Sequence, residues 1–109
     1  MAYFMNDVMG GVVDQPDETQ IRDILAELTN ADDEHPDISL VHESGWSLSV
    51  FRDKVLTWEN VEDPAIAPRE TSLTSWDDVV DLLLELAHGH ITEVDRTISR
   101  MPNIIAPER

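Results

Sequence analysis

Two histidines separated by one residue, His88 and His90, are the side chains in this chain best placed to bind a metal ion. Two imidazoles at this spacing can chelate zinc from an extended segment, and the nearby carboxylates of Glu85 and Asp95 could complete its coordination shell. Histidines are also favoured at the C-terminal end of a helix by its dipole, and this explains both residues without a metal. We therefore expect neither a metal site nor a cofactor.

Carboxylates are so abundant that no pair of them identifies a general acid and a general base. That chemistry needs one carboxyl group whose pKa is raised by burial beside another that stays ionised. Glu59 and Glu62 flank the end of an expected strand, but such pairs arise by chance at this density of acids. The sequence has no glycine-rich phosphate loop, no Ser-His-Asp order and no His-Glu-x-x-His motif. We expect that the protein has no catalytic residues and is not an enzyme.

The dominant chemical property of the chain is its charge. It has 23 acidic and seven basic residues, which give a formal charge of −16 at pH 7, whereas small domains ordinarily carry a net charge of magnitude ~2–8. The excess costs folding free energy through self-repulsion, but it also speeds encounter with cationic partners. Nucleic acids and anionic membranes are disfavoured, because binding them requires clustered Lys and Arg. We therefore expect a basic protein as partner, with no direct nucleic-acid or membrane binding.

The first candidate surface for such a partner is a row of acids, Asp77, Asp81 and Glu85, at four-residue intervals along an expected helix. Like charges at this spacing destabilise a helix by about 0.2–0.5 kcal/mol per pair, and the helix dipole offsets this only near the N-terminus. An unfavourable charge pattern of this kind suggests a face kept for a basic partner. The alternative is an ordinary solvated helix face.

The second candidate surface is a negative rim on the expected sheet. The acids Glu59, Glu62 and Asp63, together with the segment 32–37, flank the strands and could surround Phe51. An exposed aromatic side chain ringed by carboxylates is typical of an interface that receives a cationic patch. The alternative is that another element, such as the N-terminal segment, covers the phenyl ring.

The elements that position these side chains belong to one domain, residues 1–109, as the chain length predicts. A helix is expected to follow Asp14 as its N-cap, with Pro16 and Asp17 in the first turn. One apolar stripe at helical spacing marks the face of this helix that packs on the core. The stripe consists of Ile21, Ile24, Leu25 and Leu28.

Three strands are expected next, over residues 38–42, 46–51 and 55–61, because large apolar and β-branched side chains alternate there with polar ones. Residues 62–73, which include two prolines, are expected to form a loop. Residues 1–13 are expected to form an edge strand or a mobile arm.

Side-chain parity decides how the second and third of these strands are joined. A slip of one residue would turn every side chain to the other face of the sheet. A three-residue loop over 52–54 pairs Val50 with Leu56 and Leu48 with Trp58, so that both pairs are apolar. A two-residue loop would place a carboxylate and a hydroxyl on the apolar face. The three-residue loop is therefore the predicted connection.

A second helix is expected to begin at Thr74 or Ser75, each of which has an aspartate three residues later, as in a capping box. Its wide apolar stripe predicts that it is the centre of the fold, and Gly89 ends it. The stripe consists of Trp76, Val79, Val80, Leu83, Leu86 and Ala87, broadened by Leu82 and Leu84. A shorter helix follows and ends at Pro102, before a tail of residues 103–109. The expected fold is α+β, with a small antiparallel sheet of about three strands packed against two or three helices.

The segment 45–60, GWSLSVFRDKVLTWEN, followed by a capped leucine-rich helix, resembles small acidic bacterial immunity proteins of the Imm1 kind. Proteins of that family are single-domain α+β antidotes that bind and block a secreted toxin, often a nuclease or a deaminase. The resemblance covers roughly the middle half of the chain. It implies an α+β fold and a toxin as partner, and it assigns no binding residue.

These observations predict an acidic inhibitor or antidote that occludes a basic surface of a toxin or nuclease. The alternatives are a DNA mimic, phage-encoded or cellular, that blocks a DNA-binding or defence protein, a small histidine-dependent metalloenzyme, and an acidic housekeeping domain of a salt-adapted organism. The N-terminal apolar stretch has no basic residue before it, and no apolar run approaches the ~20 residues that span a bilayer. We therefore expect a cytoplasmic location.

Overall fold

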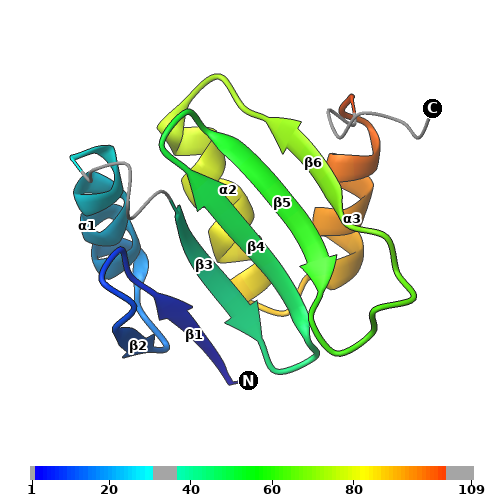
Figure 1. Ribbon diagram of the computed structural model, residues 1–109, viewed down its shortest axis with the longest axis horizontal. Helices are drawn as coiled ribbons and strands as arrows, with labels where there is room; N and C mark the ends of the chain where they lie inside the picture. Colours follow the sequence, from blue (N-terminus) through cyan, green and yellow to red (C-terminus); the bar gives the residue numbers. More distant parts are fainter. Residues whose placement is uncertain (1, 31–36, 103–109) are drawn as a thin grey trace.

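The computed structural model describes residues 2–30 and 37–102, which form one antiparallel sheet with helices packed on one of its faces (Figure 1). The acidic segment 32–36 and the predicted tail 103–109 lie outside the described residues. In chain order the elements are β1 (Tyr3–Asn6), β2 (Val12–Asp14), α1 (Glu18–Thr29), β3 (Asp37–His42), β4 (Trp46–Phe51), β5 (Val55–Asn60), β6 (Arg69–Ser72), α2 (Trp76–Ala87) and α3 (Ile91–Ser99).

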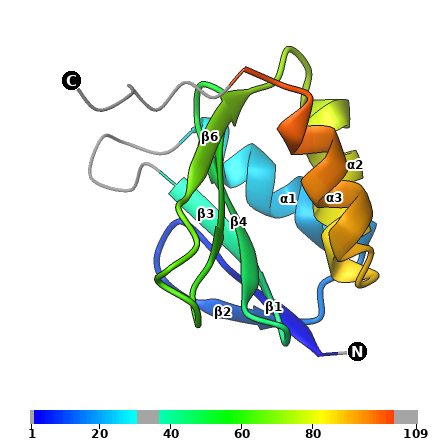
Figure 2. The ribbon, with the colours of Figure 1, turned by 90° about the vertical axis from the view of Figure 1, so that its right-hand side faces the viewer.

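The α+β class is confirmed, but the sheet has six strands instead of about three, in the order β2-β1-β3-β4-β5-β6. Figure 2 shows that α1, α2 and α3 all lie on the same side of the sheet, so that the described part of the molecule has two layers. The edge strands β2 and β6 have only three and four residues. Strands this short are held by backbone hydrogen bonds to a neighbour, and their side chains show too little alternation to predict them.

The N-terminal segment forms two strands, where the sequence suggested one edge strand or a mobile arm. β1 lies inside the sheet, between β2 and β3, and its Met5 is fully buried. β2 forms the edge of the sheet. Its Asp14 pairs with Phe4 of β1, so the prediction that Asp14 caps the first helix is wrong.

Helix α1 is capped by Asp17 instead. The Asp17 carboxylate accepts a hydrogen bond from the backbone N–H of Gln20 at 2.9 Å, and the Gln20 side-chain oxygen accepts one from the backbone N–H of Asp17 at 3.0 Å. This reciprocal capping box satisfies two N–H groups at the start of the helix. The Tyr3 hydroxyl donates to the Pro16 carbonyl at 2.7 Å and so ties β1 to this cap. Burial, and then the charges of Asp17 and Asp14, raise the pKa of Tyr3.

The predicted register of the central hairpin is confirmed. Val50 pairs with Leu56 and Leu48 with Trp58, and all four side chains are buried beneath the helices. The three-residue loop is possible because Lys54 adopts a left-handed conformation, with a φ of 67°. A turn followed by one left-handed residue is a common way to close a three-residue hairpin loop.

The loop predicted over residues 62–73 is wrong in its last part, because residues 69–72 form β6 and pair with β5. The side chains of this strand are arginine, glutamate, threonine and serine, so it has no apolar pattern that could reveal it. Thr71 lies opposite Leu56 and is buried. β6 thus extends the sheet beyond the hairpin that the sequence indicated.

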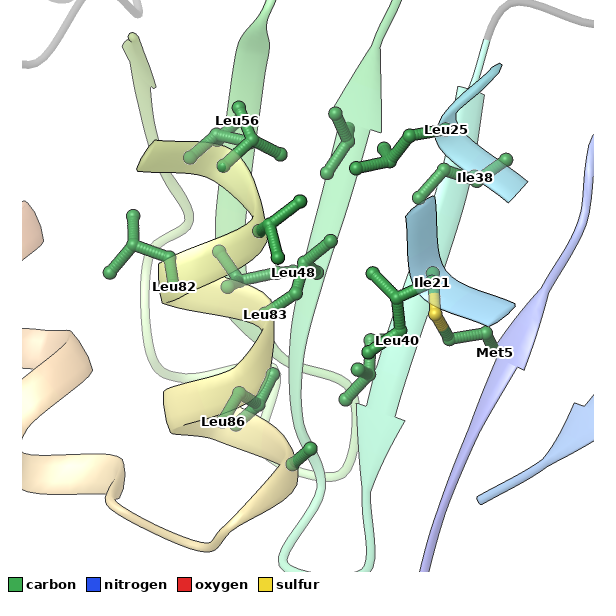
Figure 3. Packing of buried hydrophobic residues seen from close by; sticks show 14 of the residues in the cluster. Met5, Ile21, Leu25, Ile38, Leu40, Leu48, Leu56, Leu82, Leu83 and Leu86 are labelled. Atoms are coloured by element: carbon green, nitrogen blue, oxygen red, sulfur yellow. The ribbon is translucent and has the colours of Figure 1, made fainter. Parts of the chain in front are cut away.

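The apolar stripes predicted for the two long helices are confirmed. α1 buries its four stripe residues, and α2 is capped by Ser75, whose hydroxyl accepts a hydrogen bond from the backbone N–H of Asp78 at 3.1 Å. Gly89 follows α2 with a φ of 78°, as expected for a glycine that ends a helix. Figure 3 shows Leu83 pointing from α2 toward Leu48 of the sheet. The buried residues of α2 are Val79, Val80, Leu82, Leu83, Leu86 and Ala87.

A tryptophan from the sheet fixes the position of α3. Trp58 is buried, and its indole N–H donates a hydrogen bond to the Asp95 carboxylate at 3.1 Å. Its ring stacks on Trp46, with the ring centroids 4.5 Å apart. Val94 and Ile98 of α3 are also buried. The last helix is therefore held by both an apolar face and a directed polar contact.

Among the described residues, no helix combines the length and the apolar character needed to cross a lipid bilayer.

Because the Leu83 side chain is 0% exposed, replacement of Leu83 by Ala is expected to lower the free energy of unfolding by about 2–5 kcal/mol. Replacement of its neighbour Leu84, which is only partly buried, removes the same atoms and should cost clearly less. Urea denaturation of both variants measures the difference. Equal losses of unfolding free energy in the two variants would contradict the deeper burial of Leu83.

Candidate functional site

A groove with a volume of about 380 Å³ runs between α2 and α3. Its walls carry four carboxylates, and apolar side chains form part of its lining. We call it the acidic groove. Its lining residues are Leu73, Asp78, Asp81, Leu82, Glu85, Glu93, Thr97 and Met101. Pockets that bind small ligands typically have volumes of ~300–1,000 Å³, so the groove is large enough to receive a ligand or a side chain of a partner.

Helical spacing brings these side chains together. Asp78, Asp81 and Glu85 are three and four residues apart on α2, so they lie on one flank of the helix. Glu93 and Thr97 are four residues apart on α3 and face them. Because α2 and α3 are joined by a short turn, they run antiparallel, as Figure 1 shows. Glu85 and Glu93 therefore lie toward the turn.

The four carboxylates of the groove differ in their partners. Glu85 is bonded to the His90 imidazole at 2.8 Å, and Glu93 forms an ion pair with Arg96 at 3.0 Å. Within residues 2–30 and 37–102, neither Asp78 nor Asp81 has an ion-pair partner. Asp78 lies in the first turn of α2, where the helix dipole favours a negative charge. Asp81 lies beyond that turn and lacks this compensation.

The members of the predicted row, Asp77, Asp81 and Glu85, lie along α2 but differ in their partners. The Asp77 side chain is directed toward α1, where it forms an ion pair with Arg22 at 3.1 Å. Arg22 also pairs with Glu18 at 3.0 Å, and hydrogen bonds to the two carboxylates raise the pKa of its guanidinium. Only the other two members of the row, Asp81 and Glu85, line the acidic groove.

In the predicted rim, Phe51 and the acids Glu59, Glu62 and Asp63 lie at opposite ends of the β4–β5 hairpin. Phe51 lies at the loop end of the β4–β5 hairpin, half-buried, on the sheet face opposite the helices. Glu59 pairs with Ser47, four residues along β4 from Phe51, which corresponds to roughly 13 Å. Glu62 and Asp63 follow β5 at that same distant end. The structure therefore brings these three acids neither to Phe51 nor to the acidic groove, whereas Asp37, from the predicted segment 32–37, lies opposite Phe51 on β3.

The two histidines lie at the ends of helices. His88 is the C-cap of α2 and His90 the N-cap of α3, with their ring centroids 5.9 Å apart. Asp95, which the sequence suggested as a further ligand, instead accepts the hydrogen bond from Trp58. In the part of the chain that the structure describes, no three His, Cys, Asp or Glu side chains are grouped to hold a metal ion.

Of the four carboxylates that line the acidic groove, the sequence indicated Asp81 and Glu85 but neither Asp78 nor Glu93. Asp78 could have been found because it lies three residues before Asp81, but the row was chosen at four-residue intervals and therefore began at Asp77. Glu93 and Thr97 lie on α3 and Met101 follows it, so only the packing of α3 against α2 brings them to the site.

Comparison of the chain with protein-family models, with curated proteins and with solved structures gives no match.

Replacement of Asp81 by Asn is expected to stabilise the fold at low salt. The change removes repulsion from carboxylates one turn away, each worth about 0.2–0.5 kcal/mol. The gain should shrink between about 0.01 M and 1 M salt, as the Debye length falls from about 30 Å to 3 Å. Urea denaturation at the two salt concentrations measures it.

Asp77→Asn is the matched control, because it removes the same charge from the same helix but also breaks the ion pair with Arg22. This variant should show no comparable gain. Equal stabilisation by the two variants would mean that Asp81 is no less compensated than Asp77.

Proposed function

We propose that this protein is an inhibitor of the antidote type, which binds a basic surface of a toxin or nuclease and occludes it. The observation that carries the proposal is the acidic groove, in which Asp78 and Asp81 have no ion-pair partner among the described residues. Both carboxylates are exposed, so a partner can reach them without breaking an existing ion pair. A cationic partner could therefore form new ion pairs with them.

The mechanism is steric and electrostatic occlusion. A net charge of −16 attracts a cationic partner over a distance and raises the rate of encounter, which can reach ~10⁸–10⁹ M⁻¹s⁻¹ at low salt. In the complex, the carboxylates would pair with Lys and Arg side chains that otherwise hold phosphate groups of nucleic acid. Membership of the Imm1 kind of immunity proteins is part of the same proposal, and the α+β architecture is compatible with it.

The arrangement of the acids in the groove favours a compact binding surface over a mimic of DNA. A mimic would be expected to present two regular rows of carboxylates. The groove has three carboxylates on its α2 wall, Asp78, Asp81 and Glu85, and one on its α3 wall, Glu93. This is a single row with one facing acid, which suits a local patch of cations.

The proposal is tested by affinity capture from the native host at low salt, followed by purification of the captured protein. We expect a basic protein whose association rate falls at least tenfold between about 0.05 M and 0.5 M salt, because screening removes the steering. Saturation with the acidic chain should abolish binding of nucleic acid by the partner. An acidic or neutral partner, or an association rate insensitive to salt, would rule the proposal out.

A double variant, Asp78→Asn with Asp81→Asn, tests whether the groove is the binding surface. Asp23→Asn with Glu27→Gln removes the same charge from exposed positions on α1 and serves as the control. We expect the groove variant to weaken the complex much more than the control. Equal effects would place the binding surface elsewhere on the protein.

A further inference from the structure

The two flanks of α2 carry similar acids but differ in what neutralises them. On the flank toward α1, the guanidinium of Arg22 binds two carboxylates at once, Asp77 at 3.1 Å and Glu18 at 3.0 Å. On the flank toward α3, Asp78 and Asp81 are three residues apart, and no described cation reaches them. Among the described residues, Asp77 therefore shares an arginine with Glu18, whereas the pair Asp78 and Asp81 on α2 has no arginine bound to it.

The shape of the acidic groove also fits an arginine side chain. Leu73, Leu82 and Met101 supply apolar surface beside the carboxylates, and Figure 3 shows Leu82 directed to the α3 side of α2. Long cationic side chains bury their alkyl stems on apolar surface and keep the charged head among polar groups. A groove that is part apolar and part acidic offers both environments within one side chain's length.

The chemistry favours a guanidinium over an ammonium group. A guanidinium is planar, presents five N–H donors and is more weakly hydrated than an ammonium ion, so it loses less on entering a partly apolar groove. Neighbouring carboxylates one helical turn apart can each accept from a different edge of the same guanidinium. Arg22 shows that one guanidinium in this molecule can bind two carboxylates, there from two helices, Glu18 of α1 and Asp77 of α2.

We propose that the acidic groove is the receptor for a single arginine side chain of the partner protein. Its guanidinium binds Asp78 and Asp81, and its alkyl stem lies on Leu82 and Met101. This inference rests on the proposed function and adds to it the chemical identity of the anchor residue.

The test is an NMR titration of the ¹⁵N-labelled protein at low salt with three short peptides, blocked at both ends, that differ at one central residue. The central residue is arginine, its neutral isostere citrulline, or lysine. We expect the arginine peptide to shift the amide signals of residues 78–85 and 93–101 in a saturable way, with an affinity near the millimolar range. Citrulline should bind at least fivefold more weakly, because it lacks the charge. Lysine should lie between the two.

Asp81→Asn should weaken binding of the arginine peptide by about three- to tenfold. Asp23→Asn carries the same change in net charge on α1 and should alter binding by less than about twofold. Both positions are exposed, so both variants are expected to fold. Amide spectra of the free variants verify this.

Several results would overturn the inference. These are shifts that avoid the groove, equal binding of citrulline, equal binding of lysine, equal effects of the two variants, or no saturable binding. None of these results would refute the proposed function, because occlusion of a basic partner is measured separately with the captured protein. Conversely, a partner that is not basic refutes the proposed function even if the arginine peptide binds in the groove.

Discussion

The packing of α2 on the middle of the sheet is the contact on which the rest of the molecule depends. Val79, Leu83 and Leu86 are fully buried, and α2 contacts β3, β4, α1 and α3. The apolar side of the helix faces the core. Its remaining residues must therefore project toward the two neighbouring helices or into water. The acids of α2 are sorted in this way, with Asp77 on the α1 flank and Asp78 and Asp81 on the α3 flank.

This sorting explains how so acidic a domain can fold and still keep an acidic surface available. Self-repulsion at a charge of −16 opposes compaction, and it is offset by one continuous apolar core to which the sheet and all three helices contribute. Ion pairs relieve part of the repulsion where an arginine is available, as at Arg22 and Arg96. Seven basic residues face 23 acidic ones in the whole chain, so there are too few cations for each carboxylate to have its own. The groove is where such carboxylates meet apolar surface.

The walls of the groove are held by contacts that lie outside it. The hydrogen bond from Trp58 to Asp95 and the stacking of Trp58 on Trp46 fix α3 to the sheet, and the core holds α2. At the turn between the helices, His90 binds Glu85. A surface whose shape is set before binding loses less conformational entropy when it binds, which favours affinity. This is why two side chains that take no part in the groove, Trp58 and Asp95, matter for its geometry.

The sequence alone determined the features that depend on the spacing of apolar residues along a helix and on the alternation of side chains along a strand. It determined the apolar stripes of α1 and α2, the end of α2 at Gly89, and the pairing of Leu48 with Trp58, and it narrowed the cap of α2 to Thr74 or Ser75. These follow from the spacing of side chains along one element or from two strands joined by a short loop. Only the tertiary structure decided the rest, because the rest depends on contacts between distant segments. β2 and β6 exist through backbone bonds to neighbouring strands, so their short sequences carry no sign of them. Consecutive residues on a helix project about 100° apart, so Asp77 and Asp78 face different neighbours, and the positions of α1 and α3 determine which acid is paired and which lines the groove.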